Sequence, residues 1–217
     1  MRFLVQLEIV ATALRAAGRA RVSRLLVAVA SLAIIGCFNG SLVENFHSAY
    51  QPRTHRLALG PLVNLSPDAA GANAGRAIRQ AIYSELKQRQ DQYSVEIQDI
   101  AATDQALRDA DVADSLAERM TSPALAHLLN VDAVMRGVVT RYKKKSVGRQ
   151  VANALVFGYA SGGEVRAIVA IYDGGDGQAT WTYNINLTGE IFTTPDGLRK
   201  WAGHAVAVTF PYKKSKH

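Results

Sequence analysis

Two segments near the C-terminus constrain the fold more than any other feature of this sequence. "EVRAIVAIYD" (164–173) is rich in β-branched residues, and "QATWTYNINL" (178–187) alternates apolar and polar residues, both of which are typical of β-strands. "GGDG" (174–177) between them supplies the glycines that a tight turn with positive φ requires. The segments therefore predict an antiparallel hairpin, with Ile168, Val169 and Ile171 on one strand and Trp181, Tyr183 and Ile185 on the other.

The remaining chain alternates strand and helix patterns. Strands are predicted at 55–64, 93–98 and 131–142, with Gly60–Pro61 making a bulge or a strand end in the first of them. An amphipathic helix is predicted over 75–90, short helical pieces over 101–120, and helices over 122–130 and 194–210. The order β-α-β-α-α-β-β-β-α predicts an α+β domain, a mixed β-sheet packed by helices.

Polar residues at the helix ends give sharper expectations. Ser122 is predicted as an N-cap with Pro123 at the first helical position, and the last helix is expected to be capped around Thr194 or Asp196.

The chain has one cysteine, Cys37, at the end of an apolar run. The run "LLVAVASLAII" (25–35) is shorter than the ~20 residues that a spanning helix needs, and Arg19, Arg21 and Arg24 precede it. "IIGC" resembles the signal of bacterial lipoproteins, in which the chain is cleaved before a cysteine that carries lipid. This resemblance implies cleavage between Gly36 and Cys37 and lipid attachment at Cys37. The alternative is a free cysteine in a buried or amphipathic helix.

The formal charge of +7 is concentrated before Cys37. That part of the chain holds five arginines and one glutamate, which leaves 20 basic and 17 acidic residues for the rest. The excess of basic residues is therefore weak support for a nucleic-acid partner, and none is expected.

These observations divide the chain into segments. Residues 1–36 are predicted as a lipoprotein-type signal peptide, 37–55 as a lipidated, aperiodic tether, and 56–210 as a periplasmic α+β domain. Residues 143–163 are predicted as an insertion in that domain, and 211–217 as a basic tail. Phe38 follows the cysteine where lipoproteins retained in the inner membrane tend to have aspartate, so the resemblance implies the outer membrane, with the domain facing the periplasm.

Three stretches together resemble a periplasmic superfamily: "AIRQAIYSELKQR", "ALAHLLNVDAVMRGVVTRY" and "VRAIVAIYDGGDGQATWTY". The superfamily includes the N-terminal domain of TolB, the curli secretion lipoprotein and the lipoprotein activators of penicillin-binding proteins. Its members have a Gly-Ala-Asp turn between helix and strand, which "NVD" (130–132) replaces here, so the resemblance implies that Asn130 makes this turn. They also have a hairpin turn, here "DGGDGQATW" (173–181). The resemblance implies a fold and an envelope setting, with roles as scaffolds, export-pore subunits or partner-binding lipoproteins.

The segment 143–163 combines basic and apolar residues and is long for a connection without structure of its own. In one interpretation it is a surface connection that tucks Phe157 into the core. In the other its basic residues meet anionic headgroups and its apolar part enters a membrane or a neighbouring subunit. The candidate contact residues are Lys143, Lys144, Lys145, Arg149, Phe157 and Tyr159.

No catalytic or metal-binding pattern is found, so neither an enzyme nor a cofactor is expected. The five histidines lack helical metal-ligand spacing, and "DADVAD" (109–114) lacks the glycine of a calcium loop.

Three classes of function follow, in order of support. The first is an outer-membrane lipoprotein whose domain binds an envelope protein partner in an export or assembly system. The second is a homo-oligomeric subunit of a secretion channel of the curli-export type. The third is a hydrolase, for which Asp173, Asp176 or His204 would be the groups to test.

Overall fold

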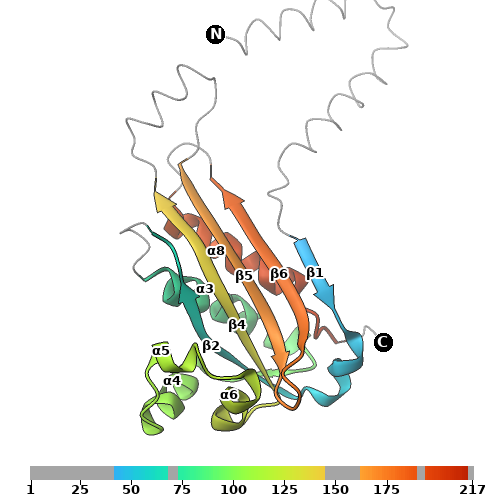
Figure 1. The fold of residues 1–217 in the computed structure, drawn as a ribbon. Helices are drawn as coiled ribbons and strands as arrows, with labels where there is room; N and C mark the ends of the chain where they lie inside the picture. Colours follow the sequence, from blue (N-terminus) through green and yellow to red (C-terminus); the bar gives the residue numbers. More distant parts are fainter. Residues whose placement is uncertain (1–41, 68–72, 145–161, 190–193, 215–217) are drawn as a thin grey trace, which may run out of the picture.

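A six-stranded sheet forms the centre of the molecule (Figure 1). The computed structural model describes residues 42–67, 73–144, 162–189 and 194–214. The strand order is β1-β6-β5-β4-β2-β3, in which β2 runs parallel to β3 and β4 and the other neighbours are antiparallel. The predicted α+β class with a mixed sheet packed by helices is confirmed. The strands are β1 (Leu42–Phe46), β2 (Arg56–Asn64), β3 (Glu96–Ile97), β4 (Ala133–Lys144), β5 (Gly163–Asp173) and β6 (Ala179–Thr188).

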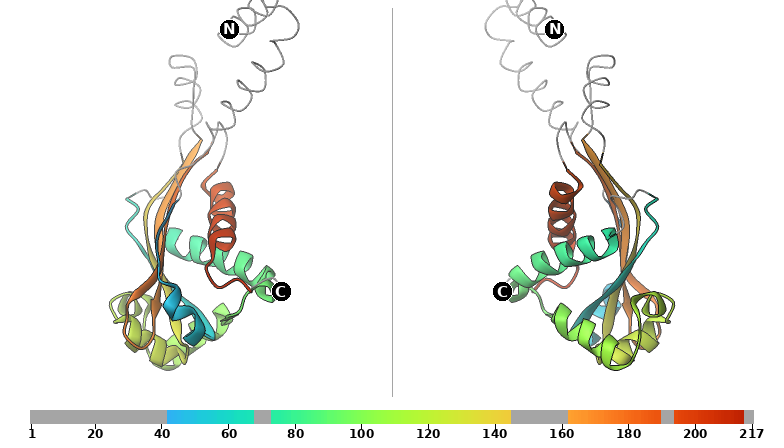
Figure 2. Two further views of the ribbon diagram at one scale, coloured as in Figure 1. Left: turned by 90° about the vertical axis from the view of Figure 1, so that its right-hand side faces the viewer. Right: turned by 90° about the vertical axis from the view of Figure 1, so that its left-hand side faces the viewer.

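Helices cover both faces of the sheet to different extents. Helices α3 (Ala74–Gln88) and α8 (Pro195–Thr209) lie together on one face, as Figure 2 shows. Helices α4 (Ile100–Asp109), α5 (Asp114–Ala117) and α6 (Ser122–Leu129) gather at one end of the sheet, away from the start of α8 (Figure 1). Among the described residues, no helix lies over the other end of the second face.

The period-two pattern of the strands divides their side chains between two cores. Leu57, Leu59 and Met135 belong to the larger core, with the buried side of α3 and α8. Their neighbours Ala58 and Val134 belong to the smaller core, with residues of α4, α5 and α6. Successive side chains of a strand point to opposite faces, so these strands had to be apolar on both sides at this end of the sheet.

The predicted hairpin is β5 and β6, paired antiparallel from Glu164↔Thr188 to Tyr172↔Ala179. Gly177 has a φ of 73°, the left-handed conformation that favours glycine. Trp181, Tyr183 and Ile185 are buried, as the alternation predicts, whereas Ile168 faces the opposite side of the sheet and is exposed. The β2 bulge at Gly60–Pro61 is also confirmed, because the register with β4 shifts between Leu59 and Leu62.

The helix caps confirm two predictions and correct one. Asn130 adopts the left-handed conformation after α6, and Thr194 caps α8 by accepting a hydrogen bond from the N–H of Gly197 at 3.2 Å. The N-cap of α6 is Thr121, not Ser122, because the Thr121 hydroxyl is the one that accepts from the N–H of Ala124. Serine and threonine are both favoured N-cap residues. The sequence therefore does not show which of the two adjacent residues caps the helix.

The prediction of an aperiodic chain up to residue 55 is wrong for the part described. Residues 42–46 form β1 on the edge of the sheet, and Ser48–Arg53 form the 3₁₀-helix η2. The strand has no buried side chain among those described, so it has no apolar alternation to be recognised by. The start of the predicted basic tail is also packed, since Tyr212 is buried and Lys213 bridges to Tyr93.

Candidate membrane-facing site

Several chain segments meet at the end of the sheet opposite to α4, α5 and α6 (Figure 1). Strand β4 ends there at Lys144, which pairs with Gly163, the first residue of β5. Strand β6 ends there at Thr188, and α8 starts near it. Strand β1 enters the sheet from the same side, its first residue Leu42 pairing with Asn184 of β6. We call this the open end of the sheet.

A cluster of charged side chains lies at the open end, on the face of the sheet opposite to α3 and α8. Glu164 forms ion pairs with Arg166 at 2.6 Å and with Arg141 at 3.7 Å. Lys143 is the cross-strand partner of Glu164. The bulge in β4 between Val139 and Arg141 makes Arg141 the partner of Arg166, and Lys143, two positions on, shares that face. Three cations around one carboxylate give the cluster a net positive charge.

The exposure of these groups leaves the cations available to a ligand. The Glu164 side chain is only 12% exposed, whereas the side chains of Arg141 and Arg166 are 43% and 53% exposed. The carboxylate therefore lies beneath the guanidinium groups and holds them in place. A planar guanidinium presents donors in a fork that suits phosphate oxygens, so the surface fits anionic headgroups.

Tyr142 fixes the open end from the other face of β4. Its hydroxyl donates to the Asp196 carboxylate in the first turn of α8 at 3.1 Å, and its N–H donates to the Ser66 hydroxyl at 2.9 Å. Burial, and then the negative charge of Asp196, raises the pKa of Tyr142 to about 12. The neutral phenol thus ties β4, α8 and the chain after β2 together.

This raised pKa predicts a pH dependence of stability. The folded protein holds the Tyr142 proton more tightly than the unfolded chain, so the contribution is complete below pH 10 and is lost between about pH 10 and 12. The loss should be on the order of 1 kcal/mol per pH unit in that window. In urea titrations, the wild type should be more stable than Tyr142→Phe below pH 10, and the difference in unfolding free energy should shrink between about pH 10 and 12. Parallel curves would contradict the assignment.

The structure places only part of the predicted site. Lys143 and Lys144 lie at the end of β4, in the open end. Cys37, Gly36, Lys145, Arg149, Phe157 and Tyr159 lie outside the described residues. Arg141, Glu164 and Arg166 were missed, although "VTRYK" and "EVR" place charges at alternate positions of adjacent strands. Their register, which decides that they meet, depends on a bulge at Thr140 that the sequence does not reveal.

A pocket of about 470 Å³ lies between α3, α4 and α5, and two of its arginines, Arg76 and Arg79, form ion pairs with Asp114 and Asp104 in its lining. The Arg79 guanidinium, 7% exposed, donates to the Leu59 carbonyl at 2.7 and 2.9 Å and to Asp104 at 2.6 Å. Arg108 donates to Gln105. Burial, and then Asp114, raises the pKa of Glu118. The pocket therefore has structural ion pairs where a ligand site would offer unsatisfied groups.

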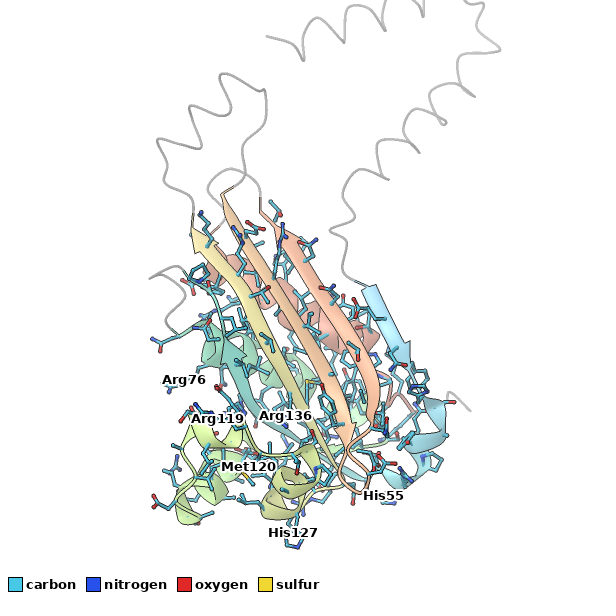
Figure 3. All side chains as sticks on the ribbon, in the orientation of Figure 1. His55, Arg76, Arg119, Met120, His127 and Arg136 are labelled. Atoms are coloured by element: carbon cyan, nitrogen blue, oxygen red, sulfur yellow. The ribbon has the colours of Figure 1, made fainter. Side chains whose placement is uncertain are left out.

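Arg136 of β4 fastens the small helices to the sheet. Its guanidinium donates to the carbonyls of Ala117, Glu118 and Met120 and to the Ser122 hydroxyl. Figure 3 shows Arg136 and Met120 together beside α5. The acceptors lie where α5 ends and α6 begins, so this one side chain satisfies carbonyls that helix ends leave free.

The three residues considered for hydrolysis do not form a catalytic group. The Asp173 carboxylate accepts from the N–H groups of Gly175 and Asp176 and from Arg53. The N–H of Gln178, with Tyr50 and Arg53, lowers the pKa of Asp176. His204 instead contacts Arg89 and Glu85. The aspartates thus stabilise the hairpin turn, and their contacts do not include the histidine.

Searches for a metal cluster and for a membrane span cover only the described part of the chain. Across residues 42–67, 73–144, 162–189 and 194–214, no group of three or more His, Cys, Asp or Glu side chains is arranged to hold a metal ion. In the same ranges, no helix has both the length and the apolar composition needed to cross a membrane.

Comparison with known proteins finds similarity in structure alone. No family model and no curated protein matches the sequence. The lipoprotein GNA1162 from Neisseria meningitidis is 16% identical, with a TM-score of 0.53 over 71% of this chain and 96% of that one. The PelC dodecamer from Paraburkholderia phytofirmans is 11% identical, with a TM-score of 0.49 over 77% and 96%. The LpoB C-terminal domain from Salmonella enterica is 8% identical, with a TM-score of 0.42 over 62% and 82%.

The similarity to GNA1162 has a TM-score above 0.5 and shows a shared fold. It agrees with the α+β fold that the resemblance of the sequence motifs implied.

Proposed function

We propose that this protein is an outer-membrane lipoprotein, anchored through Cys37, whose domain is a binding or assembly module in the periplasm. It works by contact with an envelope protein and performs no catalysis. The observation that carries the proposal is that β1 begins only five positions after Cys37, on the side of the sheet where the cationic cluster lies. An anchor at Cys37 would bring that cluster toward the headgroups.

The distance allowed by the chain supports this orientation. Five residues span at most about 17 Å when fully extended. Leu42 pairs with Asn184, four residues before the end of β6, which is roughly 13 Å of strand. A lipid on Cys37 therefore holds the open end within a short distance of the membrane surface, where Arg141, Lys143 and Arg166 can contact anionic lipid.

Attachment and electrostatic contact have different strengths. A lipidated cysteine carrying several acyl chains is a permanent anchor, because two chains already suffice for stable attachment. A basic side chain near an anionic surface contributes about 1 kcal/mol, and salt screens it. The cluster therefore orients the domain and does not by itself hold it on the membrane.

We predict that the cluster binds anionic vesicles when the lipid is absent. The double variant Lys143→Gln/Arg166→Gln of the unlipidated chain (38–217) should bind phosphatidylglycerol-containing vesicles roughly 10- to 30-fold more weakly than the wild-type chain. Co-sedimentation at 50 mM and 300 mM salt measures this, and the wild-type binding should fall at the higher salt.

The matched control is Arg76→Gln/Arg119→Gln, which removes the same charge from exposed arginines beside α5 (Figure 3). This control should bind like the wild type. An equal loss in both double variants would show that net charge alone drives binding, and the proposed orientation would then be wrong.

A further inference from the structure

Residues 42–53, here called the N-terminal arm, consist of β1 and η2 and lie on the surface of the domain. None of the side chains described between Val43 and Arg53 is buried, and the apolar Val43 and Phe46 are each 45% exposed. Apolar burial is the main term that holds elements on a domain. The arm therefore adds no side chain to either core.

Polar contacts hold the arm in place. Strand β1 pairs with β6 through a short ladder interrupted by a bulge between Val43 and Asn45. Arg53 binds Asp173 at 3.1 Å and Asp176 at 2.9 Å, and its guanidinium lies 4.2 Å from the centre of the Tyr50 ring. The Tyr50 hydroxyl donates to Asp176 at 3.0 Å. The Arg53–Asp176 pair is exposed on both sides and contributes little to stability, whereas Asp173 is only 6% exposed and makes the stronger pair with Arg53.

The remainder of the domain is complete without the arm. Strand β6 pairs with β5 over nearly its whole length, and its buried side packs with α3 and α8 through Trp181, Tyr183 and Ile185. The buried residues of the larger core begin at Leu57, after the arm ends. Loss of the arm therefore leaves both cores intact and exposes one new strand edge, the outer edge of β6.

The opposite edge of the sheet is blocked against pairing. Strand β3 covers β2 only at Arg56 and Leu57. Beyond β3, Pro61 offers no N–H, and the Arg79 side chain donates to the Leu59 carbonyl. Gly75 of α3 covers the Leu62 carbonyl so closely that a Cβ on Gly75 would lie 2.3 Å from its oxygen. Proline and covering elements are how edge strands avoid partners. In the part of the chain that the structure describes, β6 is thus the edge that can open.

We propose that the N-terminal arm releases from β6 as a unit while the domain stays folded, and that the freed edge of β6 takes an extended segment of a partner protein. The arm itself shows which occupant fits, a short antiparallel strand of mixed apolar and polar side chains that stay largely exposed. Addition of a strand to an exposed edge gives affinity through main-chain hydrogen bonds.

Release also changes the reach of the domain, a consequence that rests on the proposed anchor at Cys37. With the arm bound, five positions link Cys37 to the folded domain at Leu42. With the arm released, the link extends to the buried Thr54, and its fully extended length grows from about 17 Å to roughly 58 Å. The same event thus frees the edge and lets it move away from the membrane.

Hydrogen exchange on the full-length protein in detergent tests the release. Amides of 42–53 should exchange roughly 100-fold faster than those of the β4–β5 ladder, because local opening needs less free energy than global unfolding. Arg53→Ala should accelerate exchange in the arm about tenfold further and leave β5 unchanged. Arg76→Ala is the control, since Arg76 is an exposed arginine beside a carboxylate on α3, outside both the arm and the β4–β5 ladder, and it should not affect the arm. Exchange of the arm only together with β5 would overturn the proposal.

A photo-crosslinking peptide tests the occupant. A peptide of sequence 41–47, with a benzophenone residue in place of Phe46, should label residues of β6 several-fold more in Arg53→Ala than in the wild type. A disulfide between Asn45→Cys and Thr182→Cys, which are cross-strand neighbours, should abolish labelling, and a scrambled peptide should not label. Equal labelling of the locked and wild-type proteins would overturn the edge site. Neither experiment depends on lipid, so an unlipidated Cys37 would contradict the anchor and leave the release intact.

Discussion

Cys37→Ala should move the protein from the membrane fraction to the soluble fraction, lowering the membrane-bound share at least tenfold. Burial of acyl chains contributes about 0.8 kcal/mol per methylene, so their loss removes nearly all of the attachment. The apolar run 25–35 would remain on the unprocessed chain, but it is too short to span a membrane. Carbonate extraction of membranes, followed by immunoblotting of both fractions, measures the effect.

Phe38→Ala is the matched control for this experiment. It changes the neighbouring residue and keeps the thiol, so its distribution should equal that of the wild type. If Cys37→Ala resists carbonate as well as Phe38→Ala does, lipid on this cysteine does not hold the protein, and the orientation of the open end has no basis.

Arg79→Ala should destabilise the fold by about 3 kcal/mol, because it leaves the buried Leu59 carbonyl without donors and removes the packing of a buried side chain. The substitution leaves the Leu59 carbonyl without its two donors and Asp104 without its partner. For a domain of this size the melting temperature should fall by roughly 6–12 °C. Thermal unfolding followed by circular dichroism checks it.

Arg76→Ala provides the comparison for Arg79→Ala. Arg76 lies one turn earlier on α3, is 77% exposed, and only approaches Asp114 at 3.9 Å. Its loss should change stability by less than about 0.5 kcal/mol. Equal destabilisation by the two substitutions would mean that the helix, and not the carbonyl and carboxylate contacts of Arg79, determines the effect.

Elements that bury one face have a periodic pattern of apolar residues and could be predicted from the sequence. The β5–β6 hairpin and α3 bury one face against a core, so their apolar residues recur at the strand or helix period. Asn130 was predictable for a related reason, since few residues other than glycine tolerate a left-handed conformation after a helix.

The features that were missed have no periodic pattern of apolar residues. Strand β1 is held by main-chain bonds to β6 and buries no described side chain, so its sequence "LVENF" carries no alternation. The cationic cluster depends on the bulge at Thr140, which brings Arg141 opposite Arg166. The role of Arg136 depends on carbonyls that only the assembled α5 and α6 present to it. Each of these is a property of the three-dimensional register and not of local composition.

The intact mass of the protein purified from membranes tests the central claim most directly. We predict a polypeptide that starts at Cys37, has no free thiol, and is heavier than the unmodified chain by a diacylglyceryl group and an acyl chain. A mass equal to that of an unmodified polypeptide, whether it starts before or after Cys37, would contradict the account.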